Sequence, residues 1–102
     1  MRKYRKHQEY LIESLKDPEE ASAYLKACLD EAIETDEFGL FQVALRNVVE
    51  AQGGISKVSS KMDVGRESFY KSLSQKGKPR FSTIMHALKS CGLELEFHPR
   101  HC

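Results

Sequence analysis

Residues 55–74 constrain this 102-residue chain most, because they hold two short apolar patterns of helical spacing on either side of a turn. The apolar positions of these two patterns are Ile55, Val58 and Met62, followed by Phe69 and Leu73. Asp63 stands at the turn, where a left-handed backbone is needed, and Asp adopts that conformation more readily than most residues. Gly65 can serve as the N-cap of the second helix, and Val64 is expected to fill the corner between the helices. The segment therefore predicts a helix-turn-helix.

The second helix of this motif carries side chains suited to contact DNA. In helix-turn-helix proteins the leading turn of this helix enters the major groove. Arg66 stands in that turn, and Arg can form a bidentate contact with guanine, while Ser, Tyr and Lys reach phosphates or base edges. Alternatively, Glu67 and Lys71 form only a solvent-exposed ion pair, because they are four residues apart in the favourable order. The candidate DNA-binding residues are Lys57, Arg66, Glu67, Ser68, Tyr70, Lys71, Lys76, Lys78 and Arg80.

The formal net charge of +1 hides two halves of opposite charge. Residues 17–50 hold two basic and nine acidic side chains, a balance of −7, whereas residues 55–89 hold eight basic and two acidic ones, a balance of +6. Such a division is expected when one surface faces phosphates and another faces a basic partner, and the simpler alternative is unrelated solvated helix faces. The candidate partner-binding residues of the acidic half are Glu31, Glu34 and Glu37.

The chain has the length of one small domain, and we divide it into three parts. Residues 1–16 are expected to form a basic, partly mobile segment with a short helix after residue 7. Residues 17–97 are expected to form the helix-turn-helix DNA-binding domain, and residues 98–102 a tail. The expected fold is all-α, a compact bundle of about five helices with one short C-terminal β-strand.

Three positions define the helices that precede the motif. Asp17, followed directly by proline, predicts the start of a strong helix, since Asp is a favoured N-cap and Pro a favoured first residue. We expect Ile33 to lie on the buried face of this helix. Asp36 is expected to cap the next helix, which ends at the glycine pair 53–54.

Residues 93–97 alternate apolar and acidic side chains, the pattern of a half-buried β-strand. A single strand at the end of a helical domain leaves one hydrogen-bonding edge without a partner. We therefore expect two copies of the chain to pair through this strand as a homodimer, with Leu93, Leu95 and Phe97 on the buried face. A strand that folds back on its own chain, or a disordered tail, is the alternative.

The sequence shows no convincing catalytic, metal-binding or membrane pattern. Cys28, Cys91 and Cys102 are odd in number and widely spaced, which favours reduced thiols in the cytoplasm over disulfides or a zinc site. The His, Cys and Glu residues within 94–102 match no established spacing of metal ligands. We therefore expect that the protein is not an enzyme, binds no cofactor or metal ion and does not associate with a membrane.

Four stretches of the chain carry a more specific signal when taken together. They are Asp17 to Glu20 with Tyr24-Leu25, Phe41 to Leu45, Gly65 to Ser74, and Pro79 to Ile84. In this combination they resemble the addiction-module antidote proteins, small bacterial and prophage proteins of the Cro/repressor-like helix-turn-helix class. The resemblance covers residues 10–96, and the chain departs from the common pattern at Asp63 and Gly65, where Gly and Ser are usual.

The resemblance implies an antitoxin of a type II toxin-antitoxin pair. Such a protein binds a small basic toxin related to the RelE/ParE group and represses the operon that encodes both. Its partners would be a double-stranded DNA operator and the cognate toxin. The residues themselves support only the DNA-binding part of this function. Two alternatives therefore remain, a free-standing prophage repressor and a protein-interaction scaffold with a repressor-like fold. A toxin-sized reading frame beside this one would favour the antitoxin.

Overall fold

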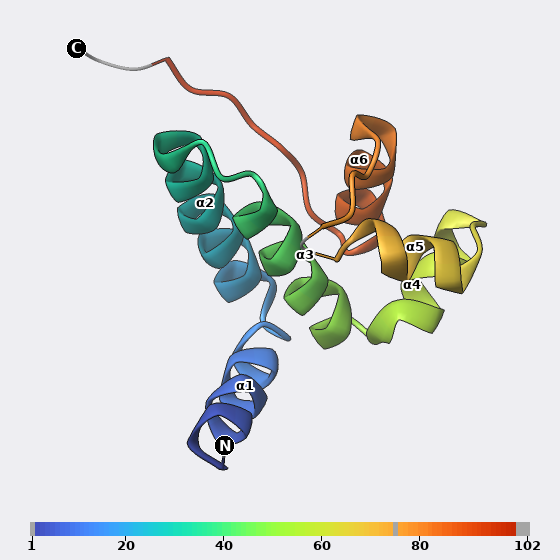
Figure 1. Ribbon diagram of the computed structural model, residues 1–102, viewed down its shortest axis with the longest axis horizontal. Coiled ribbons are helices and arrows are strands. Elements are labelled where there is room, and N and C mark those ends of the chain that lie inside the picture. The colour runs from blue at the N-terminus through green and yellow to red at the C-terminus, as the bar shows by residue number, and fades with distance from the viewer. Residues whose placement is uncertain (1, 75, 100–102) are drawn as a thin grey trace.

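The structure of the protein is a computed structural model that describes residues 2–74 and 76–99. The helices it contains are α1 (Arg2–Ser14), α2 (Pro18–Thr35), α3 (Gly39–Ala51), α4 (Gly54–Met62), α5 (Arg66–Ser72) and α6 (Phe81–Ser90). Helices α2 and α3 lie side by side, and α4, α5 and α6 gather on the far side of α3 (Figure 1). The all-α prediction is confirmed for the described residues, with six helices where about five were expected.

The hydrophobic core surrounds α3, which contacts α1, α2 and α4. Leu45, Val48 and Val49 of this helix are fully buried. The buried side chains that meet them from the second half of the chain include Phe69 and Leu73, in agreement with the apolar pattern of the motif. Burial of each such side chain stabilises the fold by roughly 1.5–3 kcal/mol. One core therefore holds both halves of the chain together.

The start of α2 agrees with the sequence, whereas its end does not. Asp17 accepts a hydrogen bond from the backbone N–H of Glu19 at 3.0 Å, which confirms the N-cap. Asp36 instead closes α2 in a left-handed conformation (φ 59°), so its predicted role as an N-cap is wrong. Because α3 begins only at Gly39, the Asp36 side chain is too far back in the chain to cap it. Ile33 is 52% exposed, so its predicted burial is also wrong.

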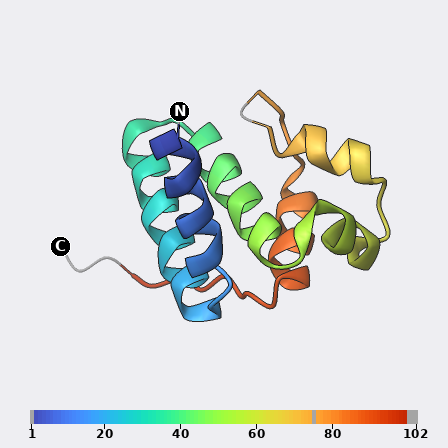
Figure 2. The ribbon, with the colours of Figure 1, turned by 90° about the horizontal axis from the view of Figure 1, so that it is seen from below.

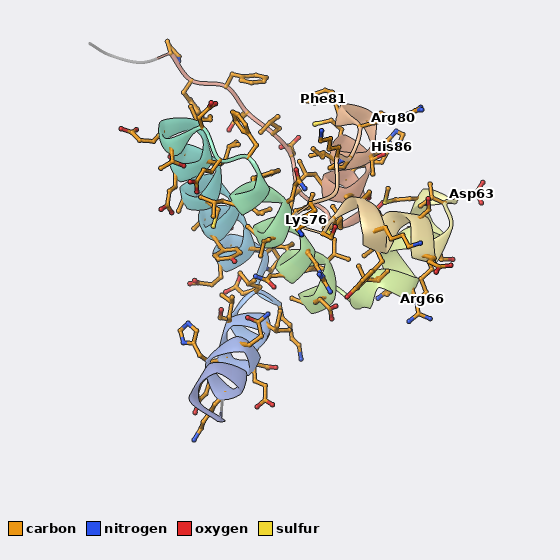
Figure 3. All side chains as sticks on the ribbon, in the orientation of Figure 1. Asp63, Arg66, Lys76, Arg80, Phe81 and His86 are labelled. Atoms are coloured by element: carbon orange, nitrogen blue, oxygen red, sulfur yellow. The ribbon has the colours of Figure 1, made fainter. Side chains whose placement is uncertain are left out.

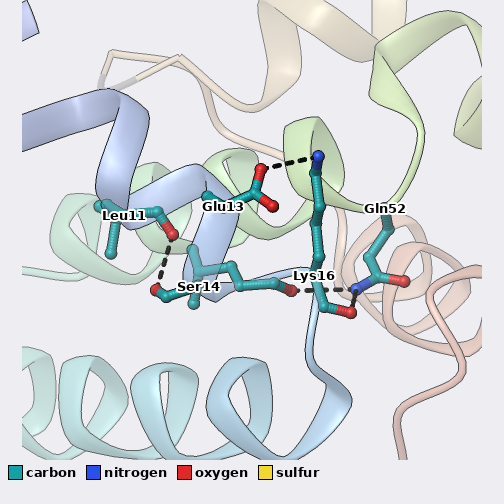
Figure 4. Close-up of polar contacts among 6 residues, drawn as sticks. Leu11, Glu13, Ser14, Lys16 and Gln52 are labelled. Atoms are coloured by element: carbon teal, nitrogen blue, oxygen red, sulfur yellow. Dashed lines mark hydrogen bonds and ion pairs between the residues drawn. The ribbon is translucent and has the colours of Figure 1, made fainter. Parts of the chain in front are cut away.

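Helix α1 begins at Arg2, earlier than the sequence indicated, and polar side chains attach it to α3. Gln8 Nε2 donates to Asn47 Oδ1 at 3.0 Å. At the other end of α1, Gln52 Nε2 donates to the backbone carbonyls of Leu15 (3.0 Å) and Lys16 (3.4 Å) (Figure 4). In the second view, seen from below, α1 stands in front of α2, but the helix that it contacts most is α3 (Figure 2).

The C-terminal segment 93–99 is extended but forms no β-strand, so the predicted strand is wrong for the described chain. The backbone N–H of Leu93 donates to the carbonyl of Leu88 at 2.9 Å, which ties the segment to the end of α6. No second strand lies beside it among the described residues, and an extended segment without a neighbour cannot form a ladder. Residues 100–102, and with them Cys102, lie outside the described residues.

Candidate nucleic-acid interface

Helices α4 and α5 are joined by a tight turn at the position the sequence predicted. Asp63 has the expected left-handed backbone (φ 56°), and Gly65 precedes α5 in an extended conformation as its N-cap. The backbone N–H of Val64 donates to the carbonyl of Ser59 at 3.1 Å. The side chain of Ser59 is small and buried, which allows the two helices to approach each other closely. Val64 itself is 43% exposed, so the prediction that it fills the corner is wrong. The buried apolar side chains of the two helices are instead Ile55 and Val58 of α4 and Phe69 of α5.

The outward face of α5 carries the side chains selected from the sequence. The exposed residues of this helix are Arg66, Glu67, Ser68, Tyr70 and Lys71. Arg66 extends away from the body of the protein at the start of α5 (Figure 3). Glu67 Oε1 lies 3.9 Å from Lys71 Nζ, so the ion pair considered as an alternative is present but loose, and both side chains stay accessible. Exposed pairs of this kind contribute little to stability, which leaves both groups free to meet a ligand.

Arg46 of α3 belongs to this surface, although the sequence analysis did not select it. Its guanidinium carbon lies 4.2 Å from the centroid of the Tyr70 ring, and its Nη2 donates a hydrogen bond to the Tyr70 hydroxyl. The contact holds Tyr70 in one orientation and adds a positive charge beside α5. One signal could have indicated it, since Arg46 is one of only two basic residues within the acidic stretch 17–50.

The connection between α5 and α6 is held against α3 and carries two further lysines. Gln42 Nε2 donates to the backbone carbonyls of Ser74 (2.9 Å) and Gly77 (2.8 Å). Gly77 lies so close to the end of α5 that an added Cβ would come within 2.5 Å of two backbone oxygens. Lys76 and Lys78, on either side of this glycine, are exposed. Gly77, the residue between the two lysines, is therefore anchored to α3.

The remaining basic candidates are less closely grouped. Lys57 is exposed on α4. Arg80 lies beside Phe81 at the start of α6, well apart from Arg66 in Figure 3. The structure thus groups the charged residues of α5 with Arg46 and places Arg80 at another part of the surface.

The predicted partner-binding residues occupy a different part of the molecule. Glu31 and Glu34 are exposed on α2, and Glu37 is exposed in the connection that follows. In the C-terminal segment Leu93 is half-buried, Leu95 is partly exposed and Phe97 is 88% exposed.

Cys28 lies in α2 and Cys91 directly follows α6, and neither thiol is activated. Cys91 is buried and Cys28 is half-buried. Burial raises the pKa of both thiols above the ordinary value, although Lys61 partly opposes this shift at Cys91. Thiols with raised pKa are poor nucleophiles at neutral pH. Within the described ranges no three His, Cys, Asp or Glu side chains gather as metal ligands would.

Comparison with known proteins gives the family. A family model described as "Probable addiction module antidote protein" matches residues 6–99. An uncharacterized protein of Haemophilus influenzae is 31% identical over 86 residues, which is 84% of this chain and 84% of that protein. No solved structure matches the chain significantly. Among the described helices, none is both long and apolar enough to cross a membrane. With nearly its whole length matched, the chain belongs to the family of addiction module antidote proteins.

Proposed function

We propose that this antidote-family protein is a sequence-specific DNA-binding antitoxin that represses its own operon and neutralises a small toxin related to the RelE/ParE group. It acts by binding, without catalysis, metal or cofactor. The observation that carries the DNA-binding part is the outward face of α5, where Arg66, Tyr70 and Lys71 are exposed on a helix packed into the core through Phe69. A rigid helix with accessible Arg, Tyr and Lys side chains suits insertion into the major groove.

The charges around α5 support phosphate contacts on either side of such a helix. Arg46 adds a guanidinium from α3, and Lys76 and Lys78 add two ammonium groups from the connection after α5. Groups that touch phosphates fix the register of a protein on DNA, whereas base contacts specify the sequence. We assign base recognition to Arg66 and Ser68, and phosphate contact to the lysines of the connection.

Operator recognition by this helix calls for two copies of the protein. A seven-residue helix such as α5 can read only a few base pairs. Repressor-like proteins reach specificity as dimers on inverted repeats, with half-sites roughly 10 base pairs apart or a multiple of that. We therefore propose that a homodimer binds an inverted repeat near the promoter of its own operon.

A gel-shift titration at physiological salt tests the DNA-binding part. The promoter fragment should bind at least about a thousandfold more tightly than a scrambled fragment of equal length. Equal affinity for the two fragments would contradict specific repression and favour a protein-interaction scaffold instead.

The toxin part is tested separately with the product of the reading frame beside this gene. Co-expression should yield a stable complex, and the antidote should restore growth that the toxin alone arrests. If that product neither copurifies nor arrests growth while the promoter is bound specifically, the protein is a free-standing repressor.

A further inference from the structure

An apolar groove of about 340 Å³ lies between α2 and α3 on one side and α6 on the other. Leu29 and Phe41 line it from α2 and α3, Ile84 and Leu88 line it from α6, and Leu95 lines it from the C-terminal segment. None of the residues assigned above to DNA contact lines this groove.

Two aromatic side chains at the groove are exposed to an unusual degree. Phe38 is 53% exposed and Phe81 is 72% exposed, although both line the groove. Leu95, which is 38% exposed, adds a third exposed apolar side chain to the lining. Single exposed apolar residues are common, but a group of them around a groove marks a surface that another molecule covers. A partner that covered Phe38 and Phe81 would bury a large apolar area on each ring.

Acidic residues flank these apolar side chains in the chain. Glu37 immediately precedes Phe38, and Glu94 and Glu96 stand on either side of Leu95. All three are exposed, and none of them has a lysine or arginine partner among the described ion pairs. On the α6 side, Arg80 is a basic residue next to Phe81. An apolar groove with predominantly acidic neighbours fits a segment whose apolar side chain is flanked by basic residues.

We propose that this groove is the docking surface for the basic toxin, which inserts an apolar side chain between Phe38 and Phe81. The proposal rests on the antitoxin function proposed above and adds the location of the contact. A second copy of the chain fits less well. If two C-terminal segments paired antiparallel around Leu95, Glu94 of one copy would face Glu96 of the other, and like charges placed opposite each other are destabilising.

The experiment measures the affinity of the full-length protein for the purified product of the neighbouring reading frame. Phe81→Asp and Phe38→Asp place a charge in the groove at side chains that are already exposed, so the fold should survive, which circular dichroism verifies. Each substitution should weaken binding about tenfold or more. Tyr10→Asp is the matched control, because Tyr10 is 67% exposed on α1 and does not line the groove. It should bind as the wild type does, and all variants should bind the promoter fragment as before.

Other results would overturn the assignment in distinguishable ways. Unchanged toxin affinity in both groove variants would exclude the groove as the docking surface and would leave the proposed antitoxin function unaffected. If the wild-type protein does not bind the toxin, both the antitoxin function and the docking surface are excluded. If sedimentation shows that Phe81→Asp converts a wild-type dimer into a monomer, the groove is covered by a second copy and the proposal is wrong.

Discussion

The guanidinium of Arg46 lies over the ring of Tyr70, with its central carbon 4.2 Å from the ring centroid, and donates a hydrogen bond to the Tyr70 hydroxyl. The two residues are 24 positions apart in the sequence and come from α3 and α5. Through this contact the central helix of the core fixes a side chain on the proposed DNA-binding face. It also brings a residue of the acidic half of the chain to the basic surface.

Replacement of Arg46 should affect both stability and DNA binding. Arg46→Ala should lower the free energy of unfolding by about 1 kcal/mol, because a cation–π contact and an exposed hydrogen bond are lost. Promoter affinity should fall too, since Tyr70 loses its fixed orientation and the surface loses a charge. Urea unfolding and gel shifts measure the two effects. Arg46→Lys is the control, since it keeps the charge without the planar group; if it equals Arg46→Ala in promoter affinity, geometry rather than charge is decisive.

Two kinds of basic residue should behave differently on DNA. Arg66→Ala should reduce the ratio of promoter to scrambled-DNA affinity, because a base contact worth about 1–3 kcal/mol is lost. Lys76→Ala and Lys78→Ala should weaken binding to all sequences alike and lower the slope of log affinity against log salt by about 1 each. Titrations at several salt concentrations separate the two classes. An unchanged salt slope in the lysine variants would contradict their assignment to phosphate.

The connection after α5 should depend on Gly77. Gly77→Ala should cost about 1–3 kcal/mol, because its Cβ would lie 2.5 Å from the carbonyl oxygens of Lys71 and Ser72 and the backbone would have to move. Gly65→Ala is the control, since the nearest atom to its Cβ lies at 3.9 Å and its φ is −66°. It should cost only about 0.5–1 kcal/mol, because Ala is a poorer N-cap than Gly. Thermal unfolding compares them. Equal loss of stability in the two variants would show that the close approach at Gly77 is relieved without cost.

Cys91 should be protected in the folded protein and should make stability fall at high pH. Burial raises the pKa of its thiol, so the folded state keeps this proton at pH values where the unfolded state has lost it. The unfolded state is then favoured as the pH rises above about 8.5, the ordinary range for a thiol. Alkylation followed by peptide mass spectrometry at pH 8 should label Cys91 slowly without urea and rapidly with it. Equal labelling rates would contradict its burial.

The acidic residues of α2 and the following connection should steer a basic partner. Charge reversal at Glu31, Glu34 and Glu37 should lower the association rate for the toxin, most strongly at low salt, and change the dissociation rate little. Stopped-flow or surface-based kinetics at two salt concentrations measure this effect. A triple variant that associates at the wild-type rate would exclude steering by these residues.

The sequence alone predicted the features that depend on a few neighbouring residues. The N-cap at Asp17, the left-handed turn at Asp63 and the apolar faces that bury Phe69 and Leu73 all agree with the structure. In each case the cause is local, since a cap, a turn or a helical stripe is determined by residues within one or two turns of each other.

Features that depend on distant parts of the chain were decided only by tertiary structure. Asp36 favours both helix starts and left-handed helix ends, and the packing of α2 against α3 selected the second. The alternating segment 93–97 has no neighbouring strand among the described residues, and its Leu95 lines the groove instead. Arg46 meets Tyr70 because α3 and α5 share one core, and no pattern within either helix contains that contact. Local propensity is read along the chain, whereas burial and contact depend on which surfaces the fold brings together.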